Sequence, residues 1–249
     1  ALDLLLQRLG RTRAAIDRYA VATGNGPAPM VAADRVDHHL AHAATAYLTS
    51  PFASAAIVVC DHEGPEVSVW RGEGASLSRV EWPWQGPGFV SVFSRCSAAL
   101  GFTQAAADQR TEALARLRPD SRDAAVDRLL RREGASLVGD PPLAAFLASR
   151  MAGHGEDGSP AHAALAAALQ GRLADLLIEF LTEVRARLGV ERICLGGSLF
   201  YHSSMNTRVR QSGVFTEVFL PVDPGDSGLA VGAALQALGC PPAHVSPFL

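Results

Sequence analysis

Strand-like and helix-like hydrophobic patterns alternate in the first hundred residues. The apolar, β-branched run SAAIVVCD at 54–61 predicts a buried strand that ends at Cys60 and Asp61, and two further strand-like runs separated by GEG follow it. Before it, DHHLAHAATAYLTSP at 37–51 predicts a helix that Pro51 ends. The first residues predict an amphipathic helix and then a short strand in RYAVATGNGP at 18–27.

The rest of the chain predicts a helical segment followed by a return to α/β structure. GPGFVSVFSRCSAALGF at 86–102 indicates a helix that a glycine introduces, and 105–188 predicts several helices broken at RPDS, GDPP and GHGEDGSP. RICLGG predicts a strand, TEVFLPVDPGDSG a strand and a loop, and GLAVGAALQAL a helix. We therefore expect an α/β first part at 1–104, a helical region at 105–188 and a C-terminal α/β part at 189–249.

The composition describes a globular chain that does not depend on bulk charge for binding. Hydrophobic residues make up 48% and the formal net charge is −3, so we expect no nucleic-acid partner and no membrane partner. The four cysteines are scattered without a CxxC pair, which favours a cytoplasmic protein over a disulfide-stapled one. Because the chain starts on a helix without an initiator Met, we also expect upstream sequence to be missing.

Two histidines of the predicted helix at 37–51 are candidates for metal binding. His38 and His42 are four residues apart and lie on one helix face, whereas His39 points elsewhere. Asp61, at the end of the buried strand, could add a carboxylate to give a mixed nitrogen and oxygen shell suited to iron, manganese or zinc. The spacing alone favours partly exposed or hydrogen-bonded histidines over metal ligands, and Asp61 taken alone is better explained as a turn or cap residue.

A second set of candidates lies near the C-terminus. Asp226 precedes Ser227 and Gly228 at the start of a predicted helix, where it could cap the helix, face a cation, or do both. Gly196 and Gly197 close a predicted strand and would let the backbone approach a phosphate, although a Gly-Gly pair is also an ordinary tight turn.

Taken together, these motifs resemble a known family. HHLAHA, the strand ending in Asp61, GPGFVSVFSRCSAALGF, DQRTEALA, CLGGSLFYHSSMNT and FLPVDPGDSGLAVGAAL occur in the order seen in the carbamoyltransferases that modify Nod factors and antibiotics. The catalytic domain of that family is similar to the tRNA threonylcarbamoyl-transfer protein. The resemblance implies an α/β fold of the actin, Hsp70 and sugar-kinase class with a helical insertion. It also implies one metal, expected to be iron with manganese or zinc as alternatives, held by His38, His42, Asp61 and Asp226.

The same resemblance implies a site for ATP or carbamoyladenylate. The matching positions are Gly196, Gly197, His202, Asn206, Gly225 and Arg110. His202 stands where the family has an asparagine, and a histidine cannot supply both amide roles. In DQRTEALA, Glu112 stands where the family has a methionine, so it either faces away from the ligand or repels a phosphate there.

The resemblance implies carbamoyl transfer to a hydroxyl on a small-molecule substrate, with the acceptor and the catalytic residues unassigned. The alternative is a catalytically impaired binding or regulatory module that works with a second protein chain or as a homo-oligomer, since we recognise neither the family's first-lobe strands nor its carbamoyladenylate-forming domain. A sugar or acetate kinase is disfavoured because such kinases do not need the histidine pair. A peptidase is disfavoured because the pair lacks the glutamate of HExxH.

Overall fold

The computed structural model describes residues 2–24, 32–103, 106–152 and 159–244. The described helices are α1 Leu2–Arg8, α2 His38–Leu48, α3 Phe89–Ala99, α4 Ala107–Ala115, α5 Ala124–Leu129, α6 Asp140–Met151, α7 Pro160–Leu188, α8 Ser203–Gln211 and α9 Leu229–Leu238. The described strands are β1 Ala20–Ala22, β2 Asp34–Val36, β3 Ser54–Cys60, β4 Val67–Glu73, β5 Ser76–Val80, β6 Arg131–Arg132, β7 Leu137–Val138, β8 Arg192–Gly196 and β9 Glu217–Phe219. These elements confirm a mixed α/β fold.

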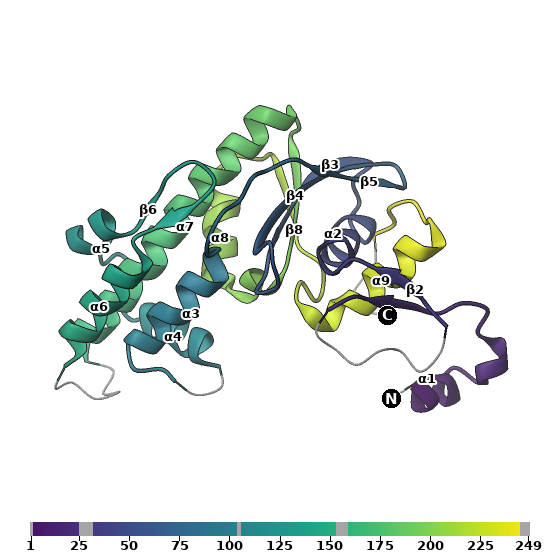
Figure 1. Cartoon of the computed structure of the whole chain (residues 1–249), viewed down its shortest axis with the longest axis horizontal. Helices are drawn as coiled ribbons and strands as arrows, with labels where there is room; N and C mark the ends of the chain where they lie inside the picture. The colour runs from purple at the N-terminus through teal and green to yellow at the C-terminus, as the bar shows by residue number, and fades with distance from the viewer. Residues whose placement is uncertain (1, 25–31, 104–105, 153–158, 245–249) are drawn as a thin grey trace.

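A five-stranded sheet forms the centre of the molecule (Figure 1), with the strand order β5-β4-β3-β8-β9. Strands β3, β4 and β5 form an antiparallel meander, while β8 runs parallel to both β3 and β9. In the β3–β8 pair, Val59 lies opposite Gly196. The carboxyl ends of β3 and β8 therefore meet at one edge of the sheet, where ligands commonly bind in open α/β sheets.

Strand β3 is the middle of the sheet and is covered on both faces. Ile57 and Val59 belong to a core with α2, while Val58 and Cys60 belong to a larger core with α3 and α7. A strand buried on both faces needs apolar side chains at consecutive positions, which explains why 55–60 does not alternate with polar residues.

The helices α3 to α7 gather on one side of the sheet (Figure 1). Helix α7 has 29 residues, and the side chain of Ser159 caps it by accepting a hydrogen bond from the His162 amide at 3.2 Å. Helix α3 precedes the predicted helical region yet packs against α4, α6 and α7. The β6–β7 hairpin inside this region was not predicted, and the predicted break at 153–160 lies mostly outside the described residues.

On the other face of the sheet, α2 packs against α9, and α9 in turn packs against the parallel pair β1–β2 (Figure 1). The predicted helix at the chain start is confirmed but is only seven residues long, Leu2–Arg8. Within the described part of the chain, none of the helices combines the length and the hydropathy that crossing a bilayer requires.

Candidate metal centre

The buried helix α2 carries the two candidate histidines. Asp37 caps the helix, because its side chain accepts a hydrogen bond from the Leu40 amide at 3.0 Å. Small alanines let the helix lie closely between the sheet and α9: Ala41, Ala43, Ala44 and Ala46 are fully buried. One turn apart on this helix, His38 and His42 point their Nε2 atoms at the same place, with the two atoms 3.1 Å apart.

Asp61 directly follows β3, and Ser198, which follows the neighbouring strand β8, holds its carboxylate in place. The Ser198 amide and hydroxyl donate to Asp61 Oδ1 at 2.9 and 2.6 Å. Burial disfavours the charged carboxylate, but contacts from His38, His42 and Ser198 outweigh it and hold the pKa of Asp61 well below its ordinary value. Asp61 is therefore an ionised carboxylate whose second oxygen, Oδ2, faces the histidines.

Asp226 lies in the short 3₁₀ turn Asp226–Gly228 that precedes α9. The turn is held against α2, because Thr45 Oγ1 donates to the Gly228 carbonyl at 2.9 Å. At Gly232, a Cβ would lie 2.0 Å from the Ala41 carbonyl oxygen, so only glycine allows α9 to approach α2 this closely. Gly228 is the N-cap position of α9, so Asp226 does not fill the capping role that the sequence left open.

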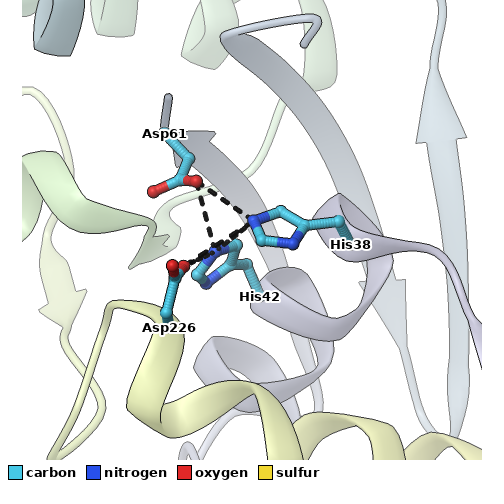
Figure 2. A group of neighbouring side chains, drawn as sticks. All are labelled: His38, His42, Asp61 and Asp226. Carbon is cyan, nitrogen blue, oxygen red and sulfur yellow. Dashed lines mark hydrogen bonds and ion pairs between the residues drawn. The ribbon is translucent and has the colours of Figure 1, made fainter. Parts of the chain in front are cut away.

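Figure 2 shows the four side chains converging from α2, the end of β3 and the turn before α9. His38 Nε2 lies 3.1 Å from Asp61 Oδ2 and 3.7 Å from Asp226 Oδ1. His42 Nε2 lies 3.7 Å from Asp61 Oδ2 and 3.5 Å from Asp226 Oδ1.

These distances fit a shared ion. Ligand atoms about 2.1 Å from one ion lie roughly 3.0–3.4 Å from each other. All four candidate ligand atoms lie within 4.8 Å of one another, so the cluster could hold a metal. Three of the ligands are buried, whereas the Asp226 side chain is 74% exposed and marks the open side of the site.

The neighbouring histidines His38 and His39 have different surroundings, which shift their pKa values in opposite directions. The hydrogen bond to Asp61 is the largest cause that raises the pKa of His38. His39 points away from the cluster, as predicted, and its ring contacts the Ser68 hydroxyl at 2.7 Å and the Glu63 carbonyl oxygen at 2.8 Å. Burial lowers the pKa of His39 and keeps it neutral.

The glycines predicted for the nucleotide site lie beside the metal cluster. Gly196 ends β8, and Gly197 follows it with φ of +95° and donates its amide to the Pro224 carbonyl at 2.7 Å. A Cβ on Gly197 would lie 2.2 Å from the Cys60 carbonyl oxygen, so this glycine is required where the backbone crosses the end of β3. Gly225 immediately precedes Asp226.

The two departures from the family pattern, Glu112 and His202, lie next to each other. His202 Nδ1 is 3.5 Å from Glu112 Oε2, and Glu112 Oε1 accepts hydrogen bonds from Ser203 Oγ, the Ser204 amide and Ser204 Oγ, each at 2.9 Å. Burial disfavours the charged form of Glu112, but these contacts outweigh it and hold its pKa well below the ordinary value. Glu112 thus joins α4 to the start of α8.

The last two nucleotide candidates lie on the same two helices. Asn206 Nδ2 donates to the Phe200 carbonyl at 2.7 Å, while its Oδ1 is buried without a hydrogen-bond partner among the described residues. The Arg110 guanidinium lies 5.0 Å from the centre of the Phe102 ring. The structure thus joins the four metal candidates directly, whereas the nucleotide candidates lie on separate neighbouring segments.

The sequence interpretation missed the residues that hold the ligands in place. Ser198 could have been found from the strand pairing. Val59 and Gly196 lie opposite each other in the parallel β3–β8 pair. Asp61 and Ser198 each follow these residues by two positions, so the two side chains are expected to lie near each other. Glu63 lies in an irregular loop, and its carboxylate oxygen Oε2 is 3.6 Å from His38 Nδ1, a contact that no periodic pattern predicts.

Comparison with known proteins agrees with the resemblance to carbamoyltransferases. Residues 144–235 match the model of the carbamoyltransferase N-terminus. The chain is 26% identical over 231 residues to an uncharacterized protein of Synechocystis sp., a match that covers 80% of this chain and 35% of that protein. It is 32% identical over 75 residues to the nodulation protein NolO of Bradyrhizobium diazoefficiens, covering 30% of this chain and 14% of that protein. The chain therefore spans about a third or less of the length of these relatives.

Two solved structures share the fold at low sequence identity. The activator of the 2-hydroxyisocaproyl-CoA dehydratase from Clostridium difficile, solved with bound ADPNP, aligns with a TM-score of 0.55 at 13% identity over 96% of this chain and 80% of its own. Full-length HypF, solved in a phosphate- and nucleotide-bound form, aligns with a TM-score of 0.50 at 13% identity over 84% of this chain and 43% of its own. The resemblance inferred from the motifs is thus confirmed: the chain is similar to the carbamoyltransferase N-terminus and to a nodulation protein, over part of its length and with divergent sequence.

Proposed function

We propose that this domain binds one divalent metal ion through His38, His42, Asp61 and Asp226 and holds an adenine nucleotide beside it. As a carbamoyltransferase-like module, it would pass a carbamoyl group from carbamoyladenylate to a hydroxyl acceptor, so that a carbamate ester forms and AMP and the hydroxyl proton are released. The observation that carries the proposal is the convergence of the four ligand atoms within 4.8 Å. Two imidazole nitrogens and two carboxylate oxygens suit iron first, with manganese or zinc as alternatives.

The chain supplies the rigid part of such a site. Helix α2 fixes both imidazoles, and Ser198 orients the Asp61 carboxylate through two hydrogen bonds. Asp226 is the exposed ligand, so a substrate would approach from its side of the cluster. When bound, the ion would supply Lewis acidity and a fixed point for phosphate oxygens.

Nucleotide binding is supported by the position of the cluster and by the shared fold. The site lies at the carboxyl ends of parallel strands, the usual ligand edge of α/β sheets. The activator that shares the fold was solved with ADPNP, and HypF was solved with phosphate and nucleotide. These observations support an actin-like fold class with Gly196, Gly197 and Gly225 near the nucleotide.

Glu112 favours a second candidate function, a catalytically impaired binding module. Its ionised carboxylate accepts a hydrogen bond from the Ser204 amide at the start of α8, and it lies next to His202. A fixed negative charge there would weaken the binding of a polyphosphate. Such a module would retain the metal and act through a second protein chain or a second copy, which sedimentation of the purified protein with and without metal would detect.

A calorimetric titration of ATP separates the two functions. Metal-free protein should bind no ATP, and protein loaded with ferrous, manganous or zinc ion should bind it. Asp226→Ala should abolish the metal-dependent binding, whereas Ser227→Ala, a change at the exposed neighbouring residue, should leave it unchanged. Metal uptake without ATP binding would favour the impaired module, and absence of metal uptake would contradict both functions.

A further inference from the structure

The imidazole ring of His38 has charged neighbours on both of its nitrogen edges. Its Nε2 faces the metal cluster, with Asp61 Oδ2 at 3.1 Å. Its Nδ1, on the opposite edge, lies 3.6 Å from Glu63 Oε2, which is an ion-pair distance. A neutral imidazole carries one proton, and a carboxylate only accepts hydrogen bonds. A proton on Nδ1 therefore satisfies Glu63 and leaves the Nε2 lone pair free for an ion.

The Glu63 carboxylate is held near the ring by its surroundings. The backbone of Gly24, after β1, covers the pair: a Cβ there would lie 3.2 Å from both Glu63 carboxylate oxygens and 3.4 Å from His38 Nδ1. The Glu63 side chain is 33% exposed, whereas that of His38 is 9% exposed, so Glu63 closes the outer edge of the His38 ring.

His39 fixes the backbone at Glu63 through a chain of hydrogen bonds in which each group donates to the next. Trp70 Nε1 donates to Ser68 Oγ at 2.8 Å, so the Ser68 hydroxyl proton is free to point at His39 Nδ1, 2.7 Å away. His39 Nε2 then carries the proton and donates to the Glu63 carbonyl oxygen at 2.8 Å. The third histidine thus holds Glu63 in position.

We propose that Glu63 is a positioning residue for metal binding: its carboxylate orients His38 so that Nε2 faces the ion, and His39 holds the Glu63 backbone in place. This inference rests on the proposed metal site. Carboxylates that accept the second ring proton of a metal-bound histidine fix its tautomer and orientation, and their loss typically weakens metal binding 10–100-fold.

The test is a zinc titration of the metal-free protein, with the dissociation constant as the readout. Glu63→Leu should bind zinc about 10–100-fold more weakly than wild type. Glu63→Gln, which keeps an acceptor for Nδ1, should lose less. Glu73→Gln, a change at an exposed glutamate of β4, should bind as wild type does. Wild-type affinity in Glu63→Leu would overturn the inference alone, while absence of zinc binding by the wild-type protein would overturn the proposed function and the inference together.

A spectroscopic readout on the wild-type protein does not depend on how the variants fold. In zinc-loaded protein with nitrogen-15-labelled histidine, the His38 signals should show a protonated Nδ1 and a metal-bound Nε2. In Glu63→Leu that Nδ1 proton should exchange faster with solvent. Metal bound at Nδ1 of His38 would overturn the inference.

Discussion

Ser198 donates both its backbone N–H and its hydroxyl to the same oxygen of Asp61, at 2.9 and 2.6 Å. This contact links the end of β8 to the end of β3, and it leaves Asp61 Oδ2 facing the histidines. The sheet register therefore sets the orientation of a candidate metal ligand, which is why residues 137 positions apart act together.

Ser198→Ala removes the hydroxyl but keeps the amide donor. One lost hydrogen bond to a buried charge should lower the free energy of unfolding by about 1.5–3 kcal/mol. The carboxylate would also be less well oriented, so metal affinity should fall roughly tenfold. Urea unfolding and metal calorimetry measure the two effects. Ser78→Ala, at an exposed position of β5, is the control, and equal behaviour of the two variants would contradict the role of Ser198.

Glu112→Gln should destabilise the protein in a pH-dependent way. Because the pKa of Glu112 is lower in the folded than in the unfolded state, its ionised form stabilises the fold. That contribution is complete above the ordinary glutamate pKa of about 4.3 and is lost as the pH falls toward the folded-state value. We expect the variant to be about 1–3 kcal/mol less stable than wild type at neutral pH.

Urea unfolding of wild type and Glu112→Gln at pH 7 and near pH 3 measures this difference. The gap between the two proteins should narrow as the pH falls. A gap of constant size across this range would mean that the charge of Glu112 does not contribute, and that the side chain acts through packing alone.

Gly232→Ala tests whether the contact between α9 and α2 positions Asp226. The added Cβ would meet the Ala41 carbonyl, so α9 must shift, at a typical cost of about 1–3 kcal/mol for overpacking. Metal affinity should fall as well, because Asp226 lies in the turn that leads into α9. Ala230→Ser, at an exposed position of α9, should change neither quantity. An unaltered metal dissociation constant in Gly232→Ala would contradict this account.

The site residues that lie on a regular helix or at the end of a regular strand could be predicted from the sequence. His38 and His42 are one helical turn apart, and Asp61 ends a continuous apolar strand, so all three positions follow from local patterns. The contact that Glu112 makes between α4 and α8 could not be predicted, because it depends on how the two helices pack in the folded protein. The sequence left open whether Glu112 faces away from the ligand or repels it, whereas in the structure its partners are Arg116, His202, Ser203 and Ser204.

Loops and close backbone approaches are the features that pattern reasoning missed. The Glu63 carboxylate and carbonyl contact two neighbouring histidines of α2, although Glu63 belongs to an irregular segment. The small residues of α9 predicted a helix, but not that Gly232 would lie against the Ala41 carbonyl. The β6–β7 hairpin was missed because strands of two residues are too short to show an alternating pattern.

The most direct test of the central claim is a metal titration of the chelator-treated protein, followed by thermal or urea unfolding. We predict one ion per chain, and a gain of about 2.7 kcal/mol in unfolding free energy when free metal is 100 times its dissociation constant. His42→Gln and Asp226→Asn should each weaken the uptake. Absence of saturable binding, or full binding by both variants, would contradict a metal centre formed by these four residues.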